Sequence, residues 1–208
     1  MWVIKLGGSL LGQPELQQWL DTLTRFGDGK IVIVPGGGIF ADAVREAQAK
    51  TSISNALAHE MAVMAMDQYA RLMTGLNADL VTASSELEIA ESGWQHRAIV
   101  WMPSSMVLSD KTLPENWDLT SDSIAAWLAS KLNADHLLLV KSEAKVPDNQ
   151  IYVEDLIESG TVDPYFARYG CNQSFKTWLL NKSEFININH LISHQSALSM
   201  GTEVITKG

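Results

Sequence analysis

KIVIVPGGGIFADAVREA, residues 30–47, runs from four apolar residues through a proline and three consecutive glycines into a helical pattern. This order predicts a buried strand, a glycine-rich connection and a helix. One glycine would be enough for a turn, since glycine adopts positive φ without strain. Three in succession remove every side chain from a length of backbone. Another group is therefore expected close to the main chain, as phosphates are in many glycine-rich strand-to-helix loops.

The same arrangement of strand, glycines and helix occurs at the start of the chain, where KLGGS follows an apolar strand expected over residues 2–6. Further strands are expected over residues 30–34, 79–83, 97–103 and 134–140, and helices over 14–26, 40–49, 54–76 and 122–132. Strands that alternate with helices predict an α/β fold. We expect a three-layer α/β/α sandwich with a mostly parallel central sheet.

Composition limits the class of protein. The chain has 208 residues, 46% of them hydrophobic, and no linker-like or repeated segment interrupts residues 1–208, so a single domain is expected. A formal net charge of −9 without a cluster of basic residues argues against a nucleic-acid surface. No segment approaches the roughly 20 apolar residues of a membrane span. Cys171 is the single cysteine, which fits a reducing compartment, and a cytoplasmic protein is expected.

Candidate binding groups gather at the carboxyl ends of the expected strands, where open α/β sheets bind their ligands. Lys5 lies near the end of the first strand and Lys141 at the carboxyl end of the strand over 134–140, while both glycine loops follow strands directly. Neither loop has the Walker A or the dinucleotide-binding pattern, which excludes a nicotinamide-dependent oxidoreductase. A lysine beside glycine amides could neutralise a phosphoryl group. Asp122 is expected in the first turn of a helix capped by Thr120 or Ser121.

Four segments resemble, in order, the motifs of the amino acid kinase family: KLGGSLL, VIVPGGGIFADAVRE, LTSDSIAAWLASKLNADHLLLVKS and LSMGTEVI. The resemblance implies the amino acid kinase fold, ATP-dependent phosphoryl transfer with Mg²⁺ on the nucleotide, and a homodimer. It assigns no protein ligand to a metal. In KSEAKVPDNQIYVED, residues 141–155, the chain departs from the glycine-rich turn that many members have beside adenine and ribose. The base preference and the contribution of Lys145 are therefore left open.

The resemblance also implies roles for individual residues. Lys5 would touch the transferred phosphoryl group, and Asp122 would orient the lysines. Lys176, in YGCNQSFKTWLL, is expected on a later helix as the second catalytic lysine, with Lys141, near the nucleotide, as its competitor. Two sets of small residues complete the site: Gly7, Gly8 and Ser9 for the ATP phosphates, and Gly36, Gly37 and Gly38 for the acceptor.

The expected acceptor is a small phosphomonoester. The size of the chain and LAHEMAVMAMDQYARLM, residues 57–73, resemble the kinases that phosphorylate a furanmethyl phosphate in methanofuran biosynthesis. A phosphate monoester is a competent nucleophile near neutral pH, so no general base is needed. His59, within an apolar helix, would read the acceptor phosphate or would be a hydrogen-bonded core histidine. Two alternatives stay open: a kinase that acts on an amino acid carboxylate, and a non-catalytic nucleotide- or oxyanion-binding protein of the same fold.

Overall fold

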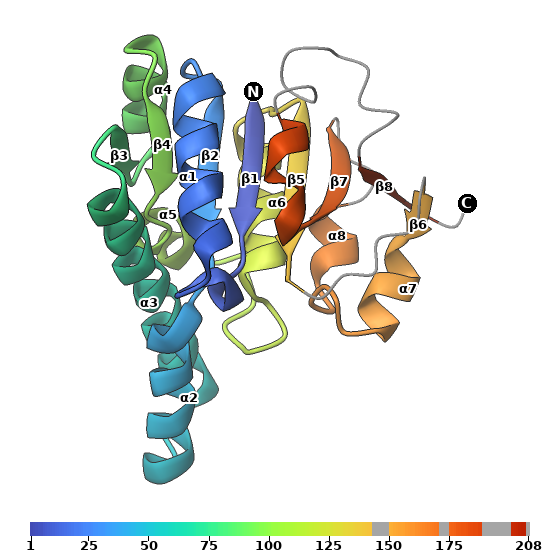
Figure 1. Ribbon diagram of the computed structural model, residues 1–208. Helices are drawn as coiled ribbons and strands as arrows, with labels where there is room; N and C mark the ends of the chain where they lie inside the picture. Colours follow the sequence, from blue (N-terminus) through green and yellow to red (C-terminus); the bar gives the residue numbers. More distant parts are fainter. Residues whose placement is uncertain (143–149, 171–174, 189–200, 207–208) are drawn as a thin grey trace.

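An eight-stranded sheet forms the centre of the protein, seen here in a computed structural model that describes residues 1–142, 150–170, 175–188 and 201–206 (Figure 1). The strands are β1 (Trp2–Leu6), β2 (Ile31–Pro35), β3 (Leu80–Ala83), β4 (Ala98–Trp101), β5 (His136–Lys141), β6 (Gln150–Tyr152), β7 (Lys176–Asn181) and β8 (Thr202–Ile205). Their order across the sheet is β3-β4-β2-β1-β5-β7-β8-β6. Neighbours pair in parallel except β7 and β8, which are antiparallel. The mostly parallel sheet expected from the sequence is confirmed.

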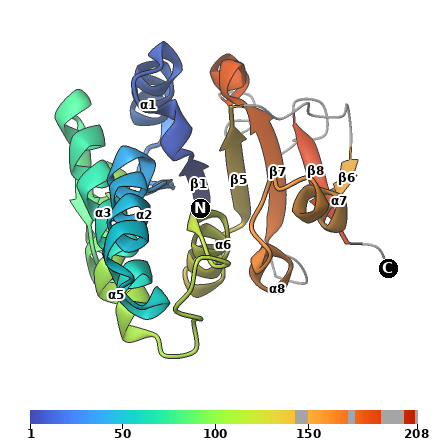
Figure 2. The same cartoon turned by 90° about the horizontal axis from the view of Figure 1, so that it is seen from below.

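Helices cover both faces of this sheet. They are α1 (Pro14–Phe26), α2 (Gly38–Thr51), α3 (Asn55–Leu76), α4 (Glu86–Trp94), α5 (Ser104–Ser109), α6 (Ser121–Lys131), α7 (Val153–Glu158) and α8 (Phe166–Gly170), with 3-10 turns η1 (Gly8–Leu10) and η2 (Lys182–Asn187). Figure 2 shows α1 on one side of β1 and β5 and α6 with α8 on the other. The three-layer α/β/α sandwich is therefore confirmed.

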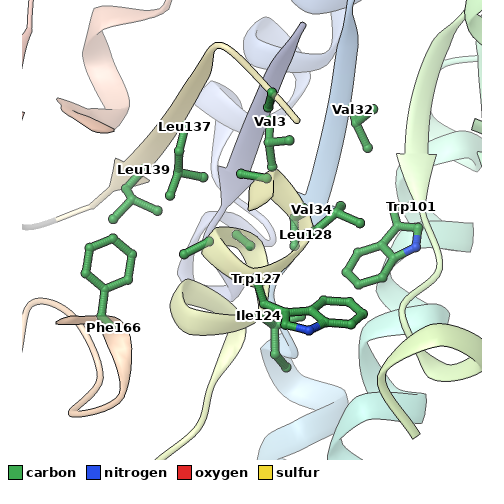
Figure 3. Packing of buried hydrophobic residues seen from close by; sticks show 14 of the residues in the cluster. Val3, Val32, Val34, Trp101, Ile124, Trp127, Leu128, Leu137, Leu139 and Phe166 are labelled. Atoms are coloured by element: carbon green, nitrogen blue, oxygen red, sulfur yellow. The ribbon is translucent and has the colours of Figure 1, made fainter. Parts of the chain in front are cut away.

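Alternate residues of the central strands face opposite layers, as the period of two in a strand requires. Val3 of β1 packs against Ile124 and Leu128 of α6 in one buried cluster (Figure 3). Its neighbour Ile4 packs with Trp19 of α1 in the other buried cluster. Lys5 has the same parity as Val3, so it belongs to the face that α6 covers. Five tryptophans also belong to this buried core: Trp2, Trp19, Trp101, Trp127 and Trp178.

The carboxyl ends of β1, β2 and β5 lie side by side, because their register is continuous. Lys5 pairs with Val34 on one side and with Leu139 on the other. The Gly36 amide donates to the carbonyl of Leu6 over 2.9 Å, which joins the two glycine loops just beyond the strands. Figure 1 shows α2 projecting past this edge, below the sheet in that view. The edge, α2 and the start of α6 are therefore available to form a site.

One helix lies in a segment where the sequence predicted none. Residues 84–96 contain α4, which begins after Ser85, whose hydroxyl accepts from the Glu88 amide over 3.2 Å. The Glu88 carboxylate reaches back to the Ser84 amide over 2.7 Å. The reciprocal serine and glutamate contacts satisfy amides that would otherwise be unpaired at the first turn.

Among the described residues, no helix has the length and apolar character needed to cross a bilayer.

Candidate active site

The two glycine loops pack backbone against backbone. A Cβ on Gly8 would collide with the backbone N and Cα of Gly38, and a Cβ on Gly36 would collide with the backbone N of Gly8. Gly38 also adopts a φ of +53°, which few other residues tolerate. The sequence therefore needs glycine at these positions partly because the loops touch each other. The expected close approach is real, and the approaching group is another stretch of main chain.

Three charged side chains meet beside these loops. Lys5 Nζ lies 2.9 Å from Oδ1 of Asp122, and Lys141 Nζ lies 2.7 Å from Oδ2 of the same carboxylate. Lys5 and Asp122 are each 5% exposed, although charged side chains are rarely buried. Lys5 is the next-to-last residue of β1, Lys141 is the last residue of β5, and Asp122 lies in the first turn of α6, as the sequence predicted. Two ammonium groups share one carboxylate, so the three groups in direct contact carry an excess positive charge.

Burial and these charges shift two pKa values in the cluster. Burial by itself raises the pKa of Asp122, but the ammonium groups of Lys5 and Lys141 outweigh it and bring the pKa below its usual value of 3.8. Burial, together with the charge of Lys5, lowers the pKa of Lys141 to about 8, while Asp122 and Asp163 oppose that shift. Lys141 is therefore protonated at neutral pH but close to titration. An anion bound beside it would favour the charged form.

Asp163 holds the start of α6 and was not found from the sequence. Its carboxylate accepts from the Thr120 amide over 3.1 Å, the Thr120 hydroxyl over 2.8 Å and the Ser123 amide over 3.1 Å, and also from the Ser123 hydroxyl. Thr120 occupies the N-cap position, but its side chain makes no capping hydrogen bond, so the hydroxyl cap expected there is wrong. Burial raises the pKa of Asp163, and the hydrogen bonds from Ser123 oppose this effect.

Ser9 and Ser142 join the first glycine loop to the end of β5. Their hydroxyl oxygens lie 2.6 Å apart. A Cβ on Gly7 would come within ordinary contact distance of both Ser9 Oγ and Lys5 Nζ, at 3.4 and 3.7 Å. The Gly7 backbone, Ser9 and the Lys5 ammonium therefore form one surface beside Lys141. Amide, hydroxyl and ammonium donors of this kind suit phosphate oxygens.

A cavity of about 460 Å³ opens beside the glycine loops. Gly8, Ser9, Gly37 and Gly38 line one end, and Thr120 and Ser121 at the start of α6 line a wall. The apolar part of the lining includes Leu11, Val63, Met66, Leu119 and Ile124. Polar and charged side chains make up the rest of the lining, and a cavity that combines apolar walls with polar groups is typical of small-molecule sites. It reaches from the loops toward α2 and α3, where charged side chains lie.

His59 lines this cavity and is 4% exposed. Its Nδ1 lies 3.1 Å from the carbonyl oxygen of Asn116, and because a carbonyl only accepts, Nδ1 carries the hydrogen. Burial lowers the pKa of His59, against weaker opposing effects of Asn116 and Glu115. The ring is therefore neutral at neutral pH. His59 is a hydrogen-bonded buried histidine, as one of the two roles considered for it requires, and it also lines the cavity. Its contact with the acceptor stays a prediction.

Arg45 and Trp117 also line the cavity, and sequence reasoning missed them. The guanidinium carbon of Arg45 lies 4.5 Å from the centroid of the Trp117 ring, and Arg45 Nη1 lies 2.7 Å from Asp42 Oδ1. The Trp117 indole donates to Gln48 Oε1 over 2.7 Å. The segment before α6 is therefore tied to α2. The one available signal was the spacing of Asp42 and Arg45, which places both on one side of a helix.

The structure does not bring Lys176 to these residues. The prediction that it lies on a helix is wrong, since Lys176 begins β7 and pairs in register with His136, the first residue of β5. Its side chain is 61% exposed and lies 3.8 Å from Glu203. Lys141, at the last residue of β5, is the lysine that joins Lys5. Cys171 and Lys145 lie outside the described residues.

Comparison with known proteins agrees with this architecture. The sequence profile of the amino acid kinase family matches residues 1–163. The chain is 27% identical over 140 residues to [5-(aminomethyl)furan-3-yl]methyl phosphate kinase from Methanocaldococcus jannaschii, an alignment covering 67% of this chain and 64% of that relative. The matched part is therefore less than two thirds of the relative's length.

Solved structures share the fold at low sequence identity. A uridylate kinase from Archaeoglobus fulgidus superposes with a TM-score of 0.70 at 17% identity, over 98% of this chain and 99% of that one. An aspartate kinase from Synechocystis superposes with a TM-score of 0.67 at 14% identity, over 100% of this chain and 40% of that one.

Proposed function

The chain belongs to the amino acid kinase family, and from that premise we propose that it transfers the γ-phosphoryl group of ATP to a small phosphomonoester. The observation that carries the proposal is the buried cluster in which Lys5 and Lys141 share the carboxylate of Asp122. Its excess positive charge lies between the two glycine loops and the end of β5. A transferring phosphoryl group would supply the missing negative charge.

The proposed mechanism depends on position and charge. An oxygen of the acceptor phosphate attacks the γ-phosphorus, the bond from that phosphorus to the β–γ bridging oxygen breaks, and ADP leaves. Lys5 and Lys141 stabilise the charge on the transferred group, which is the main contribution that a protein makes to phosphoryl transfer. Asp122 holds both ammonium groups in place. Gly7, Gly8 and Ser9 bind ATP phosphates, and Gly36, Gly37 and Gly38 bind the acceptor phosphate.

Mg²⁺ enters this proposal as part of the nucleotide substrate. The described residues contain no group of three or more His, Cys, Asp or Glu side chains that could hold a metal ion. Both oxygens of Asp122 already face lysines. Phosphate oxygens and water, the usual partners of Mg²⁺ beside nucleotides, would therefore hold it, and we assign it no protein ligand.

The acceptor we propose is an (aminomethyl)furanmethyl phosphate, which would be converted to its diphosphate. The relative from M. jannaschii is named for that substrate. The cavity suits it, because its lining offers polar groups for the phosphate and the amine and apolar side chains for the ring. We further propose that residues 1–208 form one domain, since strands from both halves of the chain share one sheet. The homodimer implied by the family resemblance stays a prediction.

A kinase that acts on an amino acid carboxylate is the second candidate. The carboxylate of Asp42, which lines the cavity, would suit the ammonium group of an amino acid. A non-catalytic oxyanion-binding protein would have no need for a carboxylate shared by two lysines. These candidates predict different products: a diphosphate, an acyl phosphate or none.

The test is phosphorus NMR of the protein with Mg-ATP and single acceptors: (aminomethyl)furanmethyl phosphate, isopentenyl phosphate, uridylate, aspartate and acetylglutamate. A new diphosphate resonance with the first acceptor is expected. Lys5→Met should reduce its rate by about a hundredfold or more, since it removes a charge aimed at the transition state. Lys30→Met is the matched control, because the Lys30 side chain is 69% exposed. An acyl phosphate would move the chain to the second candidate, and equal turnover by Lys5→Met would contradict the site.

A further inference from the structure

The acceptor cavity has a polar far end that the transfer reaction does not use. Its near end lies at the glycine loops, where the proposed function has the acceptor phosphate bind. Asp42 lies four residues after Gly38 on α2, roughly 6 Å further along the helix axis. A five-membered ring with a one-carbon arm on each side spans a similar length. Whatever the acceptor carries opposite its phosphate therefore reaches the level of Asp42.

His59 contributes a hydrogen-bond acceptor to this far end. Its Nδ1–H is used by the carbonyl of Asn116, so the neutral ring presents a lone pair on Nε2. Nε2 makes no hydrogen bond to any residue within the described ranges. A neutral ring in this tautomer has no donor left for a phosphate. It can accept from an N–H or O–H group of the acceptor.

Asp42 contributes a negative charge that can change partners. Its side chain is 70% exposed and pairs with Arg45, which is 53% exposed, and ion pairs exposed to this degree contribute little stability. The Arg45 guanidinium also lies over the Trp117 ring, 4.5 Å from its centroid, so it keeps a favourable contact if Asp42 turns away. A bound acceptor would exclude water from the carboxylate and strengthen a new charge-assisted hydrogen bond.

We infer that Asp42 and His59 form a subsite for a primary ammonium group at the end of the acceptor opposite its phosphate. The inference rests on the proposed function, and it deepens that function by naming the residues that recognise the acceptor. Asp42 binds the ammonium charge and His59 Nε2 accepts one of its hydrogens. Trp117 closes the wall of the subsite, tied to Gln48 by its indole N–H.

The opposing group is Arg45, which would favour an anion at the same end of the cavity. It is the one arginine or lysine in the described lining, so an acceptor with a second anionic group is the competing possibility. An ammonium subsite predicts that Asp42→Asn changes the acceptor preference, whereas an anion subsite predicts that Arg45→Gln changes it. They can be separated with two acceptors that differ only at the far end.

The experiment compares (aminomethyl)furanmethyl phosphate with an analogue that has a methyl group in place of the aminomethyl group. Preference is the ratio of the two kcat/KM values, measured for the full chain with Mg-ATP. Wild type should prefer the ammonium acceptor. Asp42→Asn should reduce that preference by about tenfold to a hundredfold, the usual range for a lost hydrogen bond to a charged group. His59→Phe should reduce it in the same direction.

Glu46→Gln is the matched control, because Glu46 is an exposed carboxylate on the same helix, paired with Lys50. It should keep the wild-type preference. Equal use of both acceptors by wild type would overturn the inference while leaving the kinase proposal intact. So would a preference that Asp42→Asn leaves unchanged, or one that only Arg45→Gln changes. If neither acceptor gives a product, the phosphomonoester proposal fails and the inference falls with it.

Discussion

Lys141 lies 2.7 Å from Oδ2 of Asp122, and this contact joins the end of β5 to the first turn of α6 at the centre of the candidate site. The second oxygen of Asp122 faces Lys5. Three elements of the fold are therefore connected through one carboxylate. The consequences can be measured separately for charge, stability and catalysis.

The pH dependence of turnover should report Lys141. Its pKa is lowered to about 8, so in the free enzyme it loses its proton near that pH. kcat/KM is expected to fall as pH rises through 8, because the uncharged amine cannot stabilise the transferred group. kcat should fall at a higher pH, since bound phosphates favour the ammonium form. Lys141→Met should be slower and should lack the alkaline limb of kcat/KM, and a limb that persists in this variant would assign it to another group.

The same pKa makes a prediction about stability. The folded value of about 8 lies below the ordinary 10.5, so between these values the unfolded chain binds more protons. The contribution of Lys141 to the free energy of unfolding should therefore rise from pH 8 to 10.5. Urea unfolding of wild type and Lys141→Met across this range tests it. The free energy of unfolding of wild type should increase relative to that of the variant.

Removal of Asp122 should destabilise the protein. Asp122→Ala leaves Lys5 and Lys141 buried without a counter-charge, and a broken buried pair of this kind costs about 3–5 kcal/mol. The double variant Asp122→Ala/Lys141→Met leaves one ammonium group and should recover part of the loss. Because the pKa of Asp122 is lowered, its contribution is present above pH 3.8 and is lost as pH falls through the folded value. Urea denaturation at pH 7 measures both variants, and a loss below about 1 kcal/mol would show that the charges are solvated.

The packing of the glycine loops can be tested at two glycines. Gly36→Ala places a Cβ against the backbone of Gly8 and should lower the free energy of unfolding by about 1–3 kcal/mol. Gly75→Ala is the control, because nothing lies within 4 Å of a Cβ there and the position is in α3. It should be neutral or stabilising by up to about 1 kcal/mol. If both variants have the same stability, the loops do not touch as described.

The fold was predictable because its signals are local. Apolar runs of β-branched residues, glycines and amphipathic helices follow each other along the chain, and only the chemistry at each boundary is needed to order them. The positions of Lys5, Asp122 and the glycines were predictable for the same reason, since each lies beside a strand end or a helix start. The same signal predicted Lys141 at the end of its strand. Its ion pair with Asp122 could not be predicted in this way, because it joins two different elements.

The remaining parts of the site depend on contacts between distant segments. Asp163 reaches Ser123 across 40 positions, and nothing near Asp163 in the sequence indicates that contact. Trp117 and Arg45 meet only because the segment before α6 folds over α2. Lys176 was misplaced because FKTWLLN is an apolar run that can be a strand or a helix by pattern alone. The segment forms a strand because it pairs with β5. Lys176 pairs with His136, the first residue of β5, so it lies at the amino end of the sheet.

Asp163 should act as a positioning residue for Asp122, because its carboxylate holds the Thr120 and Ser123 amides that flank Asp122. Asp163→Asn keeps one acceptor oxygen but removes the charge, so kcat should fall by about tenfold, within the range seen when supporting contacts are lost. The negative charge of Asp163 also raises the pKa of Lys141. The alkaline limb of kcat/KM should therefore move to lower pH in this variant.

Asp110→Asn is the matched control for that experiment. Asp110 accepts from Thr112 and Trp127 and pairs with Lys131 near the far end of α6, so its replacement removes comparable contacts away from Lys5 and Lys141. It should lower stability and leave the alkaline limb where it is. If Asp163→Asn behaved in the same way, with reduced stability and an unmoved limb, Asp163 would be a helix cap and nothing more. A shift of the limb without loss of the fold would show that Asp163 acts on the titration of Lys141, through its own charge or through the position of Asp122.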